Sequence, residues 1–216
     1  MARPWPELSN INFQPGKSPF RIKGGAYLGT RRQYDSLVPG GYLAVANALP
    51  NGMLTAFAMQ DFFASNWYDV FPMAVMDSTA IGLTERGVDS FLQDCANLQA
   101  SLDASGVYRL ALRAASPAVR LMPLQFIKRM VSFSHHYFSF GRSEARPLGD
   151  KVIEVVSDGL AHALADWFQR GAAYYIAALF RMSGLPAFSV EFDPVEIVDV
   201  TSPGMPLARA RWRARW

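Results

Sequence analysis

Hydrophobic residues recur at helical spacing through the first 131 residues of the chain. The strongest pattern covers residues 84–104, where apolar residues return at steps of three and four. This spacing predicts an amphipathic helix with Thr84 as its N-cap and Gly106 as its end. A second helix is predicted over residues 117–131, with a kink or break at Pro123.

Shorter helices are predicted earlier in the chain. Residues 21–49 fit short helices separated by turns at Gly24-Gly25 and at Pro39-Gly40-Gly41. Pro50-Asn51-Gly52 then opens a further helix, whose apolar face begins at Leu54. Up to residue 131 the chain is therefore predicted to be helical.

After residue 131 the apolar period changes from helical spacing to alternation. Residues 132–140 and 150–158 are predicted strands, joined by a polar loop over residues 141–149. Residues 160–183 predict a long helix that ends near Gly184 and Pro186. The chain then ends in further predicted strands at residues 187–192, 195–200 and 207–216.

This order of elements predicts an α+β fold. Residues 21–216 are expected to form one domain, helical over 21–131 and ββαββ over 132–216, with an antiparallel sheet packed on the long helix. Residues 1–20 contain four prolines among polar residues, which favours an extended arm over a packed element.

Composition places the chain among folded, cytoplasmic proteins. Half of its 216 residues are hydrophobic and 18% are charged, below the usual share of about 25%, which excludes the disordered class. The single cysteine, Cys95, cannot form an internal disulfide, as expected in a reducing compartment. The first residues lack a signal-peptide pattern, and charges interrupt the most apolar stretch, so no membrane span is expected.

The formal charge of +3 is concentrated at the end of the sequence. The last ten residues alternate, and a strand there places Arg209, Arg211, Arg213 and Arg215 on one face. This arginine ladder is a candidate interaction surface for phosphate or for an acidic partner. The favoured alternative is a salt-bridged sheet face that prevents edge aggregation, and nucleic-acid binding is not expected.

No catalytic or metal-binding pattern is present in the sequence. Phosphate-binding loops, nucleophile elbows and dinucleotide fingerprints are missing. His135 and His136 would face opposite sides of a predicted strand, and Cys95 lies on an apolar helix stripe. We therefore expect a protein that is not an enzyme and has no metal or other cofactor.

The surplus of aromatic residues suggests a ligand site. Residues from the predicted helices and sheet could line an apolar pocket. A densely packed core and an oligomer interface are the alternatives. Asp61, Asp69 and Asp77 lie around Trp67-Tyr68 and could form a polar pocket, although a helix face and helix caps are the favoured interpretation. The candidate ligand-binding residues are Trp67, Tyr68, Phe126, Met130, Tyr137, Phe168 and Tyr175.

The element order and several local patterns resemble a superfamily of sensor and tethering domains. The patterns are Ile22-Lys23-Gly24 followed by Arg31-Arg32-Gln33-Tyr34, the pair Trp67-Tyr68, and the glycines 149, 159 and 171. They are similar to haem nitric-oxide/oxygen-binding domains, 4-vinyl-reductase-like sensor domains, TRAPP vesicle-tethering subunits and, most of all, related myxobacterial proteins. The resemblance implies a bacterial domain that encloses a small-molecule pocket or presents a dimer surface.

The sequence departs from the haem-binding members of this superfamily. Those members carry an axial histidine on a helix before the first strand, and residues 84–131 here contain no histidine. Their Tyr-x-Ser-x-Arg clamp on the second strand corresponds to Val155, Ser157 and Gly159. A cysteine-rich patch used by the sensor relatives is also missing.

We therefore expect a non-enzymatic regulatory or sensory domain that binds a small apolar ligand without haem and forms a homodimer or binds a protein partner. The alternative is a structural or adaptor protein that acts through protein contacts.

Overall fold

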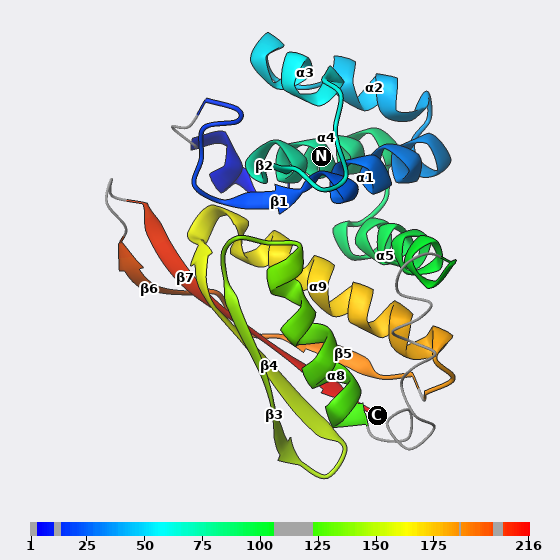
Figure 1. The fold of residues 1–216 in the computed structure, drawn as a ribbon, viewed down its shortest axis with the longest axis vertical. Coiled ribbons are helices and arrows are strands. Elements are labelled where there is room, and N and C mark those ends of the chain that lie inside the picture. The colour runs from blue at the N-terminus through cyan, green and yellow to red at the C-terminus, as the bar shows by residue number, and fades with distance from the viewer. Residues whose placement is uncertain (1–3, 11–13, 106–122, 186, 201–204) are drawn as a thin grey trace. The chain divides into compact units, whose positions relative to one another are not determined.

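The structure is a computed structural model that describes residues 4–10, 14–105, 123–185, 187–200 and 205–216. It contains helices and an antiparallel sheet packed against helices, which confirms the α+β class (Figure 1). The chain forms two compact units: Met1–Cys95 with His136–Phe140, and Ala96–His135 with Gly141–Trp216. The expectation that residues 21–216 form one domain remains a prediction. Among the described helices, none is both long and apolar enough to cross a membrane.

The first unit is mainly helical. A two-stranded antiparallel sheet pairs Ile22 with Tyr68, and an isolated bridge joins Ile22 to Phe138 on its other side. Its elements are η1 (Pro6–Asn10), β1 (Arg21–Lys23), α1 (Gly24–Leu37), α2 (Gly41–Asn47), α3 (Gly52–Met59), β2 (Trp67–Asp69), α4 (Phe71–Thr84) and the first part of α5 (Val88–Ser105).

Gly24-Gly25 begins helix α1, so the predicted turn at this position is wrong. The reason for glycine is a close approach of the chain. A Cβ atom on Gly24 would lie 2.2 Å from the carbonyl oxygen of Phe63 and 2.7 Å from the Tyr68 ring. The amide of Gly24 also donates to the carbonyl of Asn66 at 2.8 Å. Only glycine fits where α1 and the segment before β2 meet.

Helix α4 was not predicted, and it changes the start of the next helix. Almost all of its residues are buried, so its sequence lacks the polar face that reveals a surface helix. Thr84 is the last residue of α4 and not an N-cap, because Glu85 follows it in a left-handed conformation with φ of 56°. Helix α5 begins at Val88, and its predicted end at Gly106 lies outside the described residues. The predicted helix opened by Pro50-Asn51-Gly52 is confirmed as α3, with Asn51 as its N-cap.

The described part of residues 1–20 is packed within the first unit. An arm that lies on the domain or on a partner stays a prediction. Trp5, Leu8 and Phe20 are buried, and Ser18 is fully buried. The carboxylate of Asp69 holds this segment: Oδ2 accepts from the amides of Gly16 (3.0 Å) and Ser18 (3.1 Å), and Oδ1 accepts from the Ser18 hydroxyl (2.6 Å). Buried hydrogen bonds to a charged acceptor offset the cost of ordering a proline-rich segment.

The second unit contains the larger sheet. Its strands run in the order β3-β4-β7-β5, with β6 also paired to β7, and all pairs are antiparallel. The elements are the second part of α5, α8 (Pro123–Ser132), β3 (Arg142–Gly149), β4 (Val152–Ala161), α9 (His162–Met182), β5 (Ser189–Phe192), β6 (Glu196–Val200) and β7 (Pro206–Arg215), with η2 (Phe133–His136) at the boundary between the units. The long helix and the last three strands confirm the predictions there.

The first strand of this sheet was predicted in the wrong place. Residues 132–140 contain the single 3-10 turn η2 and not a strand, whereas the predicted loop at 141–149 is strand β3. Strand β3 lies at a sheet edge, and Ala145 is its one buried residue, so its sequence shows no alternation. Pro147 is tolerated because edge strands can accept proline.

Helix α8 begins at Pro123, where a kink or break was predicted. Proline suits the first turn of a helix because its missing N–H has no intrahelical partner there. The predicted start of this helix, residues 117–122, lies outside the described residues.

One face of the sheet packs against α8 and α9 (Figure 1). Phe126 of α8, Phe180 of α9 and Trp212 of β7 belong to one buried cluster, and the rings of Phe126 and Phe180 meet edge to face at 5.4 Å. The predicted alternation of β7 is confirmed, because Ala208, Ala210, Trp212 and Ala214 are all buried.

The arginine ladder lies on the opposite side of β7 and is salt-bridged. Its N–O distances are 2.5 Å for Arg209–Asp158, 2.6 Å for Arg211–Glu196, 2.7 Å for Arg213–Asp193 and 3.9 Å for Arg215–Glu191. This pairing is what the salt-bridged alternative predicted. Any role of the ladder in binding a partner stays a prediction.

Replacing Asp69 with asparagine is expected to lower the free energy of unfolding by about 2–4 kcal/mol, because an amide cannot accept from all the donors that face the carboxylate. Ser18→Ala removes a single donor and should cost about 1 kcal/mol. Urea denaturation of the full chain measures both values. Equal, small effects of the two variants would contradict the role assigned to Asp69.

Candidate functional site

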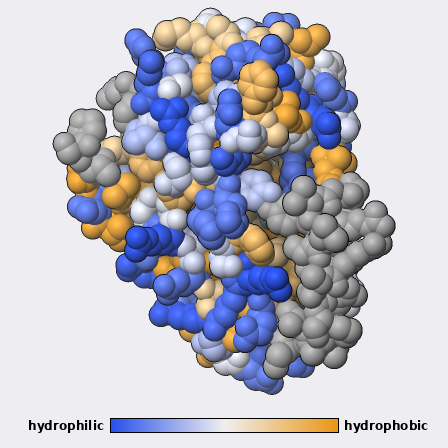
Figure 2. Space-filling model, in the orientation of Figure 1, coloured by the Kyte–Doolittle hydropathy of each residue, from blue (hydrophilic) through white to orange (hydrophobic). Residues whose placement is uncertain are grey.

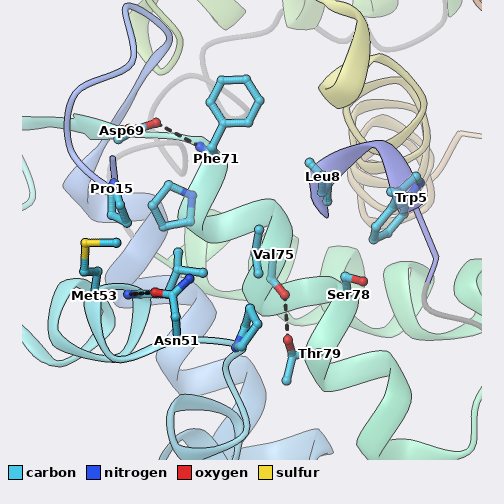
Figure 3. Close-up of a pocket in the computed structure, with 13 residues that line it drawn as sticks. Trp5, Leu8, Pro15, Asn51, Met53, Asp69, Phe71, Val75, Ser78 and Thr79 are labelled. Atoms are coloured by element: carbon cyan, nitrogen blue, oxygen red, sulfur yellow. Dashed lines mark hydrogen bonds between the residues drawn. The ribbon is translucent and has the colours of Figure 1, made fainter. Parts of the chain in front are cut away.

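A pocket of about 280 Å³ lies within the first unit (Figure 3). Trp5 and Leu8 from the N-terminal segment form one wall. Asn51 and Met53, at the start of α3, form a second wall, and α4 forms the third. Proline and aromatic rings add to the lining, which includes Pro15, Pro50, Phe71, Pro72, Val75, Ser78 and Thr79. The pocket is therefore built mainly from apolar side chains.

The polar side chains around the pocket are hydrogen-bonded within the protein. The Ser78 hydroxyl donates to the carbonyl of Pro4 at 2.8 Å, and the Thr79 hydroxyl donates to the carbonyl of Val75 at 2.8 Å. Asn51 Oδ1 accepts from the amide of Leu54 at 2.9 Å. These bonds position the walls.

Three of the predicted ligand-binding residues belong to the first unit, and none of them lines this pocket. Trp67 is 42% exposed, and Lys23 Nζ lies 4.0 Å from its ring centroid. The Tyr68 hydroxyl accepts from the amide of Phe63 at 3.0 Å. The carbonyl of Tyr137 accepts from the amide of Lys23 at 2.9 Å. These contacts hold β1 and β2 in place.

The other four predicted residues belong to the second unit. Phe126, Met130 and Tyr175 come together in the apolar cluster between the sheet and its helices. The Tyr175 hydroxyl donates to Asp103 Oδ2 at 2.6 Å, and Phe168 is buried on α9. The packing of these residues matches the densely packed core that the sequence left open as an alternative.

The predicted cluster of Asp61, Asp69 and Asp77 is divided by burial. Asp61 is exposed, whereas Asp69 and Asp77 are 1% and 8% exposed. Asp69 Oδ1 also accepts from the amide of Phe71 at 3.1 Å, and Asp77 Oδ1 accepts from the Tyr34 hydroxyl at 2.6 Å. Burial and the nearby charge of Asp77 raise the pKa of the Tyr34 phenol well above its ordinary value, so this hydroxyl remains a donor.

The histidines lie in places that the sequence did not predict. His135 and His136 belong to the 3-10 turn η2, so the expectation that they occupy opposite faces of a strand is wrong. His162 is the first residue of α9. Within the described parts of the chain, no three His, Cys, Asp or Glu side chains are grouped as metal ligands.

One exposed surface was missed at the sequence level. Residues 36–60 contain no charged residue, and the stretch folds into α2 and α3. Leu43, Met53 and Met59 are each about half exposed there, and the top of Figure 2, over α2 and α3, is tan to orange. The missing charge was the signal that could have identified this surface, which we call the α2–α3 surface.

Comparison with known proteins identifies the fold. Neither a protein-family model nor a curated protein matches the sequence. An oxygen-binding H-NOX domain related to soluble guanylate cyclases, in its oxygen complex, matches with a TM-score of 0.57 and 12% identity, covering 90% of this chain and 94% of its own. A Cs H-NOX mutant carrying 4-cyano-L-phenylalanine matches with a TM-score of 0.62 and 13% identity, and the match covers 90% of this chain and 96% of the mutant. An Fe(II) unliganded H-NOX protein from K. algicida matches with a TM-score of 0.58 and 10% identity, and the match covers 88% of this chain and 95% of that protein. The chain therefore has the H-NOX fold.

The residues of this chain do not fit a haem held by the histidine and clamp of the haem-binding superfamily members. Neither α8 nor the described α5 contains a histidine. At the clamp positions on β4, Val155 packs in the apolar cluster, and the Ser157 hydroxyl shares a 2.7 Å hydrogen bond with Ser143. Gly159 offers no side chain. Of the three positions that the resemblance assigns to the propionate clamp, one packs in the apolar cluster, one is hydrogen-bonded to β3 and one has no side chain.

Stability above pH 9 should depend on Cys95. Burial, with the charge of Asp77, raises the pKa of this thiol from an ordinary value of about 9. The folded chain keeps the proton where the unfolded chain loses it, so the contribution is present below pH 9 and is lost as the pH rises. Under reducing conditions the free energy of unfolding should fall by about 1 kcal/mol between pH 9 and 10 on account of this group.

Cys95→Ala removes the titrating group and provides the control. Its unfolding free energy should fall by about 1 kcal/mol less than that of the wild type over the same interval. Chemical denaturation at fixed pH values measures both slopes. Parallel slopes would show that the thiol does not distinguish the folded from the unfolded state.

Proposed function

We propose that this chain is a non-enzymatic sensory domain that binds a small apolar ligand and does not use a histidine-ligated haem. The observation that carries the proposal is the H-NOX fold over 90% of the chain, combined with apolar or hydrogen-bonded residues at the haem-clamp positions. The matched domains include one that binds oxygen and is related to soluble guanylate cyclases. The shared fold supports ligand binding as the function, and the changed residues support a different ligand.

The seven ligand-binding residues named from the sequence remain part of this proposal. Phe126, Met130 and Tyr175 are the members that lie in one cluster, so a ligand among them would displace side-chain packing. A bacterial, cytoplasmic setting and a homodimer are likewise proposed. A dimer would let a ligand-dependent change in one copy alter its contacts with the other.

Native mass spectrometry of freshly purified full chain, together with a visible absorption spectrum, tests the function. We expect a population that carries one additional small molecule, and no Soret band. A ligand-free protein that also binds no small apolar molecule would overturn the sensory proposal. A stoichiometric Soret band would overturn the part that concerns haem.

A structural or adaptor role is the second candidate, and the α2–α3 surface favours it. A helix as apolar as α3 is usually buried on all sides, and methionines adapt readily to partner surfaces. Deleting residues 1–20 is a poor test of this role because it removes the buried side chains of Trp5, Ser18 and Phe20. Point substitutions on exposed residues avoid this problem.

The double substitution Leu43→Lys and Met59→Lys should abolish partner capture in a pull-down while leaving the unfolding transition within about 1 kcal/mol. Gln93→Lys adds a charge at an exposed position of α5, outside this surface, and serves as the control. Capture that survives the double substitution would exclude the α2–α3 surface as the adaptor site.

A further inference from the structure

Among the described residues that line the pocket of the first unit, none offers a charged group to a ligand. Asp69 is the ionisable residue among them, and its two oxygens accept four hydrogen bonds from Gly16, Ser18 and Phe71. A ligand carboxylate or ammonium entering the pocket would lose its hydration without gaining an opposite charge. The cost of such a transfer is several kcal/mol. The chemistry of the walls therefore selects against charged molecules.

The hydroxyl groups of the pocket restrict the ligand further. Ser78 and Thr79 both use their protons on backbone carbonyls, at 2.8 Å each. A hydroxyl oxygen whose proton is engaged can still accept a hydrogen bond. At Ser78 and Thr79 the pocket is thus suited to a group that donates a hydrogen bond, while the Asn51 side chain, also in the lining, uses its oxygen on the amide of Leu54. Pro15, Phe71 and Trp5 supply flat surfaces for a planar ring.

The wall formed by the N-terminal segment contains a residue in an unfavourable backbone conformation. Trp5 has a φ of 57°, a left-handed conformation that is unfavourable for a bulky residue. Trp5 and Leu8 are each 7% exposed, so the segment is kept in this conformation by burial and by the bond from Ser78 to Pro4. Figure 3 shows both side chains beside the pocket.

We propose that this pocket, bounded by Trp5, Val75 and Ser78, binds a neutral, planar, largely apolar molecule with a single hydrogen-bond donor. The volume of about 280 Å³ is just below the usual range of ligand sites, which is about 300–1,000 Å³. Contact with Trp5 and Leu8 makes the N-terminal segment the element that responds to the ligand. The inference rests on the proposed sensory function, and it adds a ligand class and a site apart from the seven residues named from the sequence.

Indole is a suitable probe because it is planar and neutral and carries one N–H donor. Indole should bind the full chain saturably by calorimetry and should shift the side-chain N–H resonance of Trp5, assigned with Trp5→Phe. Indole-3-acetate, which adds a carboxylate, should bind at least tenfold more weakly. No shift at Trp5, or equal binding of the two compounds, would overturn the proposal.

Val75→Phe places a larger side chain on the α4 wall and should weaken indole binding at least tenfold. Val198→Phe, at an exposed position of β6 in the second unit, is the matched control and should leave binding unchanged. Unchanged binding in a folded Val75→Phe protein would overturn the proposal. If Val75→Phe does not fold, the Trp5 shift in the wild type decides alone.

The pocket and the sensory function can be refuted separately. A molecule detected by native mass spectrometry whose presence leaves Trp5 unperturbed would refute this pocket and leave the sensory function standing. A chain that binds neither indole nor any co-purified molecule would refute both.

Discussion

The first unit depends on the buried carboxylate of Asp69. Its side chain accepts hydrogen bonds from Gly16 and Ser18 in the N-terminal segment and from Phe71 at the start of α4. Its backbone carbonyl accepts from the Tyr27 hydroxyl of α1 at 2.5 Å. Asp69 thus connects the N-terminal segment, α1 and the start of α4. The first and the last of these stretches lie more than forty residues apart in the sequence. Asp69 and Phe71 of this network also line the pocket.

Patterns that depend on local spacing predicted the fold well, whereas those that depend on tertiary contacts did not. Helix α9 and strand β7 have one polar and one apolar side, so their periods are visible in the sequence. Helix α4 is buried nearly all round and β3 is exposed nearly all round, so neither shows a period. The two Gly24-Gly25 residues read as a turn because the carbonyl of Phe63 that requires glycine lies far along the sequence.

The seven ligand-binding residues named from the sequence stay a prediction. Aromatic content indicates apolar surfaces, but it cannot distinguish rings packed with one another from rings that line a space. Phe126 packs against Phe180, whereas Trp5, in a segment expected to be an arm, lines the pocket. The resemblance residues Arg31 and Tyr34 also have structural roles: Arg31 donates to the carbonyls of Ala58 and Gln60, and Tyr34 to Asp77.

The central claim is that the H-NOX fold is retained here while the ligand chemistry has changed. Titration of the purified chain with haem, followed by reduction and addition of carbon monoxide, tests this claim most directly. The account predicts weak, non-saturating association without the spectrum of a histidine-ligated ferrous haem, because the clamp positions on β4 hold Val155, a hydrogen-bonded Ser157 and Gly159. Tight binding of one haem per chain with a histidine-ligated carbon monoxide spectrum would contradict it.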